Sequence, residues 1–127
     1  MESMIYTGKA EKKVLRLVFS DGDDVVSCIK QAMAENNLRE CKVVEVSGNL
    51  KEAVINCFEG NRYKKMDLKN KEIVGVSGIF KFGGGDLWGN MRILTAGAKS
   101  INGTLVSGKA AEGFQLGLSF SVEVLYP

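Results

Sequence analysis

Residues 114–126 read FQLGLSFSVEVLY, and they alternate apolar with polar or small residues more regularly than any other part of the chain. The apolar set is Phe114, Leu116, Leu118, Phe120, Val122, Val124 and Tyr126. The set between them is Gln115, Gly117, Ser119, Ser121 and Glu123. Successive side chains of a strand point to opposite faces, so this pattern predicts a strand with one face on a core. Its other face meets water or a polar interface.

A period of two also governs most of the preceding sequence. It predicts strands over Lys13–Phe19, Cys41–Ser47, Ala53–Phe58, Tyr63–Leu68, Glu72–Phe82, Leu87–Thr95 and Ile101–Val106. The breaks between them are short and rich in glycine or asparagine, including the Lys69–Asn70 pair. Connections of this length favour hairpins and antiparallel neighbours.

One segment has a helical period instead. Asp21 and Gly22 supply a turn, and Asp23 or Asp24 is a candidate cap for the helix that follows. In that helix the apolar stripe consists of Val25, Val26, Ile29, Ala32 and Met33, and the helix closes at Asn36 and Asn37.

These elements predict an α+β fold, in which an antiparallel, curled sheet of about seven strands carries one main helix. We expect a single domain over residues 1–127, because the length fits one core and no linker or repeat interrupts it. Several glycines interrupt the strands and predict bulges or close backbone approach: Gly75, Gly78, Gly103, Gly108 and Gly117.

The composition narrows the class of protein. The 17 basic and 15 acidic residues leave a net charge of +2, so no dominant field attracts nucleic acid or anionic lipid. No apolar run approaches a membrane span, and the N-terminal residues lack the apolar region of a secretory signal. We therefore expect a cytoplasmic protein without a membrane partner. The cysteines Cys28, Cys41 and Cys57 are odd in number and lack paired spacing, which predicts reduced, packing thiols.

The order of four motifs resembles the plants-and-prokaryotes-conserved (PPC) domain. The motifs are RLVFSDGDDVVSCI, VEVSGNLKEAVI, EIVGVSGIF and INGTLVSG, and the resemblance covers about Lys13 to Glu123. It implies an α+β domain that assembles as a homotrimer. In plants such domains follow AT hooks that bind A·T-rich DNA, but this sequence has no Arg-Gly-Arg-Pro core. The resemblance thus carries over the assembly domain without that DNA contact.

The stretch KFGGGDLWGNM, Lys81–Met91, raises the question of a metal or phosphate site. Many prokaryotic proteins similar to this chain carry a His-x-His pair here and a third histidine on the next strand, a set suited to an open metal site. This chain has no histidine; the third position holds Thr104, and the first two fall among Trp88–Met91. We therefore expect no metal, no other cofactor and no imidazole catalysis.

A phosphate loop is also disfavoured. Gly83–Gly85 is followed by another predicted strand, so no helix N-terminus directs its amides at an anion. A hairpin or rim loop is the favoured interpretation.

Two sets of residues remain candidates for a pocket or interface. Trp88, Asn90, Arg92 and Thr104 would line a surviving family pocket, although a solvated or subunit-facing strand surface is the interpretation we favour. Arg16 lies between two valines of its predicted strand and is a candidate partner of Glu45 or another carboxylate within the assembly. We interpret it as structural.

Three functions follow as hypotheses. The first is a non-catalytic homotrimeric domain that binds a partner, in a DNA-associated or transcriptional context. The second is direct DNA binding through Lys64, Lys65, Lys69 and Lys71. The third is a small-molecule-binding protein or enzyme that uses the pocket near Trp88 and Thr104. No catalytic residue is assigned.

Overall fold

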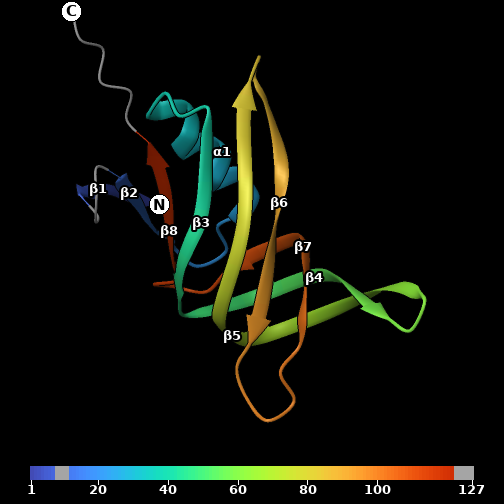
Figure 1. The fold of residues 1–127 in the computed structure, drawn as a ribbon. Coiled ribbons are helices and arrows are strands. Elements are labelled where there is room, and N and C mark those ends of the chain that lie inside the picture. Colours follow the sequence, from blue (N-terminus) through green and yellow to red (C-terminus); the bar gives the residue numbers. More distant parts are fainter. Residues whose placement is uncertain (8–11, 122–127) are drawn as a thin grey trace, which may run out of the picture.

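The structure, a computed structural model, describes residues 1–7 and 12–121 (Figure 1). The elements are β1 (Glu2–Thr7), β2 (Lys12–Val18), α1 (Val25–Glu35), β3 (Glu40–Ser47), β4 (Asn49–Glu59), β5 (Arg62–Gly83), β6 (Asp86–Thr95), β7 (Asn102–Ala110) and β8 (Gln115–Ser121). The predicted α+β class with one helix is confirmed. The last predicted strand begins as expected, and its residues 122–126 lie outside the described part of the chain.

The helix begins and ends where the sequence predicted. Asp24 has an extended backbone, and its carboxylate accepts a hydrogen bond from the Ser27 amide at 3.2 Å, which satisfies one of the free donors of the first turn. At the other end Asn37 has a left-handed backbone with a φ of 53°. None of the helices in residues 1–7 and 12–121 is long and apolar enough to span a membrane.

The eight strands form one antiparallel sheet in the order β1-β2-β8-β3-β5-β4-β7-β6. β6 also pairs with β5, so β5, β4, β7 and β6 close into a four-strand ring. The closure explains the predicted curl. Figure 1 shows β3, β5 and β6 running side by side in front of α1, while β4 and β7 cross below them.

One prediction about the strands was wrong, and one strand was missed. The pair Lys69–Asn70 does not end a strand, because β5 runs without a break from Arg62 to Gly83. Asn70 has a left-handed backbone with a φ of 50°, a conformation that asparagine tolerates better than most residues. The residues on both sides of Asn70 remain paired with β4. The strand β1 was not predicted at all; it pairs with β2 through all six of its residues.

Gly48 turns the chain between β3 and β4, and the two strands run in different directions within the curled sheet (Figure 1). Its φ is 99°, and a Cβ there would lie 3.0 Å from the Cα of Phe114, so a larger residue meets both strain and contact. β3 pairs with the second half of β5, whereas β4 pairs with the first half. One long strand therefore joins both parts of the sheet.

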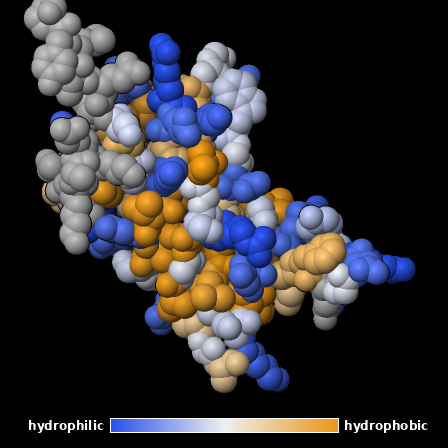
Figure 2. Space-filling model, viewed as in Figure 1, coloured by the Kyte–Doolittle hydropathy of each residue, from blue (hydrophilic) through white to orange (hydrophobic). Residues whose placement is uncertain are grey.

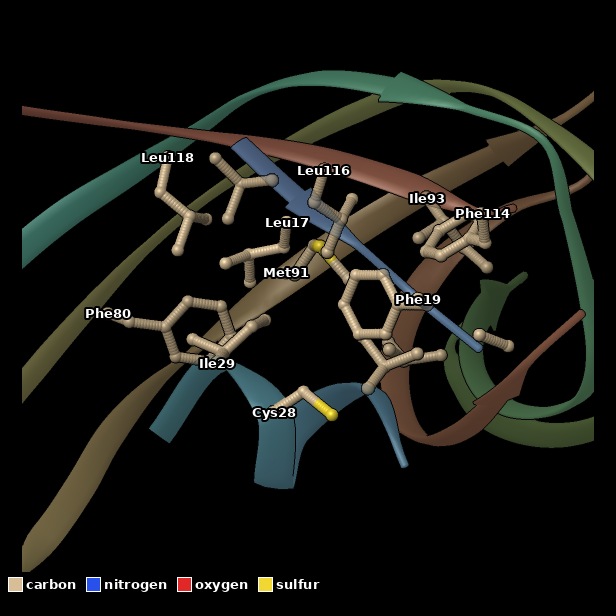
Figure 3. Packing of buried hydrophobic residues seen from close by; sticks show 14 of the residues in the cluster. Leu17, Phe19, Cys28, Ile29, Phe80, Met91, Ile93, Phe114, Leu116 and Leu118 are labelled. Carbon is tan, nitrogen blue, oxygen red and sulfur yellow. The ribbon is translucent and has the colours of Figure 1, made fainter. Parts of the chain in front are cut away.

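The core lies between α1 and the inner face of the sheet. Leu17 of β2, Phe19 just after it, Phe80 of β5 and Met91 of β6 are at most 3% exposed and surround Ile29 of α1 (Figure 3). The predicted apolar face of β8 is buried as well, through Phe114, Leu116 and Leu118. The strand patterns thus assigned the inner face correctly.

The three cysteines are unpaired, as predicted, and two are buried. Burial raises the pKa of Cys41 to about 11, although a backbone hydrogen bond to Phe80 opposes the rise. Burial also raises the pKa of Cys28, with a further contribution from the negative charge of Asp23. Both thiols are therefore protonated near neutral pH and shielded from reagents.

We expect a thiol reagent to distinguish these cysteines. In the native protein at mildly alkaline pH, an aromatic disulfide should modify Cys57 alone, because only the partly exposed thiol is accessible. Unfolding in urea should release all three thiols. The measurement is the absorbance of the released thiolate, and Cys57→Ser should abolish the native reaction; rapid native modification of two or more thiols would contradict the packing described above.

Candidate functional site

The stretch Lys81–Met91 forms a hairpin between β5 and β6. Gly83 pairs with Asp86, which leaves Gly84 and Gly85 as the two central residues, with φ values of 59° and 83°. Two positive φ values in a two-residue connection are typical of a type I′ turn. The glycines therefore serve the turn, and a strand follows them rather than a helix.

Two further glycines bring the strands of this hairpin together. A Cβ on Gly89 would collide with the carbonyl oxygen of Ile79, and the φ of Gly89 is 115°. A Cβ on Gly78 would collide with the carbonyl oxygen of Asn90. The backbones are this close because both residues lack side chains, and this contact fixes which β6 side chains face outward.

Trp88 and Asn90 lie on the outer face of β6, away from the core. Trp88 is 56% exposed and stands opposite Lys81 of β5, whereas Asn90 stands opposite Ile79. The next residue, Met91, points to the other face and is buried. Trp88 also lies beyond the part of β6 that pairs with β7, so it is not adjacent to Thr104.

Arg92 and Thr104 are direct neighbours across β6 and β7. Arg92 is exposed, and its Nη2 donates a hydrogen bond to the Oδ1 of Asn102 at 3.1 Å. The four predicted pocket residues thus share one outer face, but the structure pairs only Arg92 with Thr104.

This arrangement does not fit a divalent metal. The side chain beside Thr104 is the guanidinium of Arg92, which repels a cation. An amide and a hydroxyl are weak ligands for zinc. Within residues 1–7 and 12–121, no three His, Cys, Asp or Glu side chains are grouped so that they could hold a metal ion.

Arg16 forms the ion pair that the sequence suggested. Its Nη2 lies 3.5 Å from the Oε2 of Glu45, and the two side chains are 39% and 49% exposed. Gly117 of β8 stands between them in the sheet, paired with both residues. A Cβ on Gly117 would lie 2.9 Å from the Glu45 carboxylate, so the glycine makes room for the pair. Exposed ion pairs of this kind contribute about 0–1 kcal/mol to the free energy of unfolding. The pair therefore orients the two side chains more than it stabilises the fold.

Sequence reasoning missed an uncovered apolar surface on the outer side of the sheet. We call it the outer face, and its exposed apolar members are Val44, Val74, Ile79 and Leu94, which are 48%, 51%, 43% and 36% exposed. Figure 2 shows apolar side chains gathered on the side of the molecule where β3 and β5 lie in front of α1. The sequence did contain a sign of this surface in two pairs of consecutive apolar residues, Val43–Val44 and Ile73–Val74. Successive side chains of a strand point to opposite faces, so one residue of each pair must point outward.

Sequence reasoning also missed the shape of the β4–β5 hairpin. β4 pairs with β7 only as far as Asn56, so residues 57–64 form a two-stranded projection, here called the arm (Figure 1). It carries two exposed rings, Phe58 and Tyr63, whose centroids are 5.2 Å apart. The four predicted DNA-contacting lysines are all exposed on β5, within or just behind the arm.

Surface depressions lie elsewhere among the described residues. One of about 740 Å³ is formed by the segment after α1 and the end of β8, including Leu38, Cys41 and Phe120. One of about 330 Å³ contains Arg16, Glu45 and Gly117, and one of about 300 Å³ lies between β4, β5 and β7. The depression at Arg16 opens on the outer face of the sheet.

Fold and site together define an antiparallel, curled-sheet α+β domain with one covered and one uncovered face. The model of the Plants and Prokaryotes Conserved (PCC) domain matches residues 6–119, and the chain belongs to this family. No curated protein sequence matches the chain.

Solved structures with the same fold include three from prokaryotes. A plant- and prokaryote-conserved (PPC) protein from Pyrococcus horikoshii is 17% identical with a TM-score of 0.68, over 98% of this chain and 86% of that one. A metal-containing protein from Archaeoglobus fulgidus is 22% identical with a TM-score of 0.67, over 98% and 88%. A protein from Bacteroides thetaiotaomicron described as a "putative DNA-binding protein" is 12% identical with a TM-score of 0.69, over 96% and 85%.

Proposed function

We propose that this protein is a non-catalytic PPC domain that assembles as a homotrimer and binds a partner in a DNA-associated or transcriptional context. The observation that carries the proposal is the outer face, which exposes Val44, Val74, Ile79 and Leu94 on the side of the sheet opposite α1. A contiguous apolar surface with a polar surround is typical of a protein interface.

The surroundings of this face suit contact between copies of the chain. Lys42 stands opposite Ile79, and the Arg16–Glu45 pair lies farther along β3, so charged groups border the apolar residues. Gly75 and Gly117 lie on the same side of the sheet and have no side chains, so the backbone of another subunit could approach closely there. The interface would then have an apolar centre and a polar rim.

The chemistry of the side chains supports a non-catalytic role. The sequence contains no histidine, so neither a Ser-His-Asp nor a Cys-His arrangement can form. Arg92 beside Thr104 also disfavours the metal site of other family members. Both observations support a partner that is bound at a surface rather than converted at a catalytic centre.

We expect light scattering after size exclusion to give about 41 kDa, three times the 13.8 kDa of the chain. Ile79→Lys should shift the protein to the monomer mass at the same concentration, because an ammonium buried beside Lys42 would lack a partner. Its helical circular dichroism should be unchanged, since Ile79 faces away from the core.

The matched control is Ala34→Lys, which adds the same charge on the exposed side of α1 and should remain trimeric. A wild-type monomer at micromolar concentration would reject the trimer. An unchanged mass for Ile79→Lys would remove the outer face from the interface.

The alternative function is small-molecule binding or catalysis near Trp88 and Thr104. One observation favours it, because Trp88 is 56% exposed and shares its face with Asn90 and Arg92. A panel of metabolites that raises Tm for the wild type but not for Trp88→Ala would support this function over the first.

A further inference from the structure

The arm presents two aromatic rings to solvent, and no third strand of residues 1–7 and 12–121 pairs with it. Phe58 is 65% exposed and Tyr63 is 78% exposed, and they form an edge-on pair with an interplanar angle of 65°. They face each other across β4 and β5, so both rings lie on one face of the arm. The core cluster does not include them, and their apolar surface is available to a ligand.

The hairpin that bears these rings concentrates positive charge. From Asn49 to Lys71 it holds six basic residues and three acidic ones, a net charge of +3, whereas the whole chain carries +2. The basic members are Lys51, Arg62, Lys64, Lys65, Lys69 and Lys71. The remainder of the chain is close to neutral, so the positive charge of the protein resides in this hairpin.

A row of polar side chains crosses the ring of strands next to the aromatic pair. Arg92 pairs with Thr104, Thr104 pairs with Asn56, and Asn56 pairs with Lys65. Cross-strand partners point to the same face, so a guanidinium, a hydroxyl, an amide and an ammonium form one line. Lys65 is two residues from Tyr63, on the same face and about 7 Å along the strand.

We propose that the arm and this row bind single-stranded nucleic acid. Phosphates would be held by Lys65, and bases would stack on Tyr63 and Phe58, which is how sequence-tolerant single-strand binders work. A duplex hides the faces of its bases, so exposed rings favour the single strand. This inference deepens the proposed function by naming the class of partner. It rests on the proposed function in one respect, because a trimer would carry three copies of the arm.

The test is fluorescence anisotropy with a labelled oligothymidylate and with a DNA duplex of equal length, at low and at raised salt. The wild type should prefer the single strand. Tyr63→Ala should weaken binding roughly 5- to 100-fold, and Tyr63→Phe, which keeps the ring, should bind as the wild type does. Both positions are exposed, so folding should be retained in each variant.

A charge variant provides an independent readout. Lys65→Gln should reduce the slope of log affinity against log salt by about 0.7, the value for one phosphate contact with a single strand. The matched control is Lys30→Gln on the exposed side of α1, which removes an equal charge and should leave both affinity and slope unchanged.

Several outcomes would overturn the proposal. Equal affinity of the wild type and Tyr63→Ala for the oligothymidylate would do so, as would a preference for the duplex. If Tyr63→Ala instead lowers the molar mass in light scattering, the rings contact another subunit and the nucleic-acid role is rejected. A wild-type monomer that binds the single strand through Tyr63 would reject the trimer alone, so the two proposals fail separately.

Discussion

Gly89→Ala is expected to destabilise the protein by on the order of 3–5 kcal/mol, because the substitution combines two unfavourable effects. The φ of Gly89 is 115°, a conformation that a residue with a Cβ rarely adopts. The added methyl group would also collide with the carbonyl oxygen of Ile79, which is backbone and cannot turn aside. The strands β5 and β6 would have to separate at the centre of the hairpin.

Urea unfolding followed by circular dichroism measures this effect. The matched control is Gly83→Ala in the same hairpin, where a Cβ would lie 3.5 Å from Cζ3 of Trp88, an ordinary contact. That variant should change the free energy of unfolding by less than about 0.5 kcal/mol. Similar unfolding midpoints for the two variants would show that β6 is not held to β5 by the close approach at Gly89.

Phe114→Ala is expected to cost about 3–5 kcal/mol, with a fall in Tm of about 10–20 °C. Phe114 is fully buried, and its ring lies 5.4 Å from that of Phe19. Its carbonyl oxygen also accepts a hydrogen bond from the Phe19 amide at 2.8 Å, so the residue joins the start of β8 to the end of β2. Truncation leaves a cavity that this hydrogen-bonded backbone cannot readily fill.

Differential scanning calorimetry measures the change, and Phe58→Ala is the control. The same atoms are removed there, but Phe58 is 65% exposed and lies on the arm, so Tm should change little. A comparable loss for both variants would mean that the arm packs against something in solution. An unchanged Tm for Phe114→Ala would contradict the described core.

The sequence predicted those elements whose evidence is local. The alternation of residues 114–126 and the four-residue spacing from Val25 to Met33 each depend on one face being buried, and the structure buries those faces. Asp24 was identified as a candidate cap because helix donors need a nearby acceptor. Such features require no knowledge of distant residues.

The features that the sequence missed depend on distant pairing. Lys69–Asn70 resembles a turn, yet β4 pairs with the residues on both sides of Asn70, so the chain passes through as a strand. The ring of strands likewise depends on the pairing of β4 with β7, two segments far apart in the sequence that no local pattern joins. For the candidate site, the lysines of β5 were noticed as a charge cluster, but the pairing of Phe58 with Tyr63 requires the register of the hairpin.

The closed ring of β4, β5, β6 and β7 has a consequence for how the family can vary. Its closure depends on backbone contacts at Gly78, Gly89 and Gly103 and on buried side chains such as Ile55 and Met91, all of which lie within the wall or on its inside. Residues that point outward from the ring do not hold it closed. Outward-facing side chains can therefore change without altering the scaffold, and proteins of one shape can acquire unrelated chemistries.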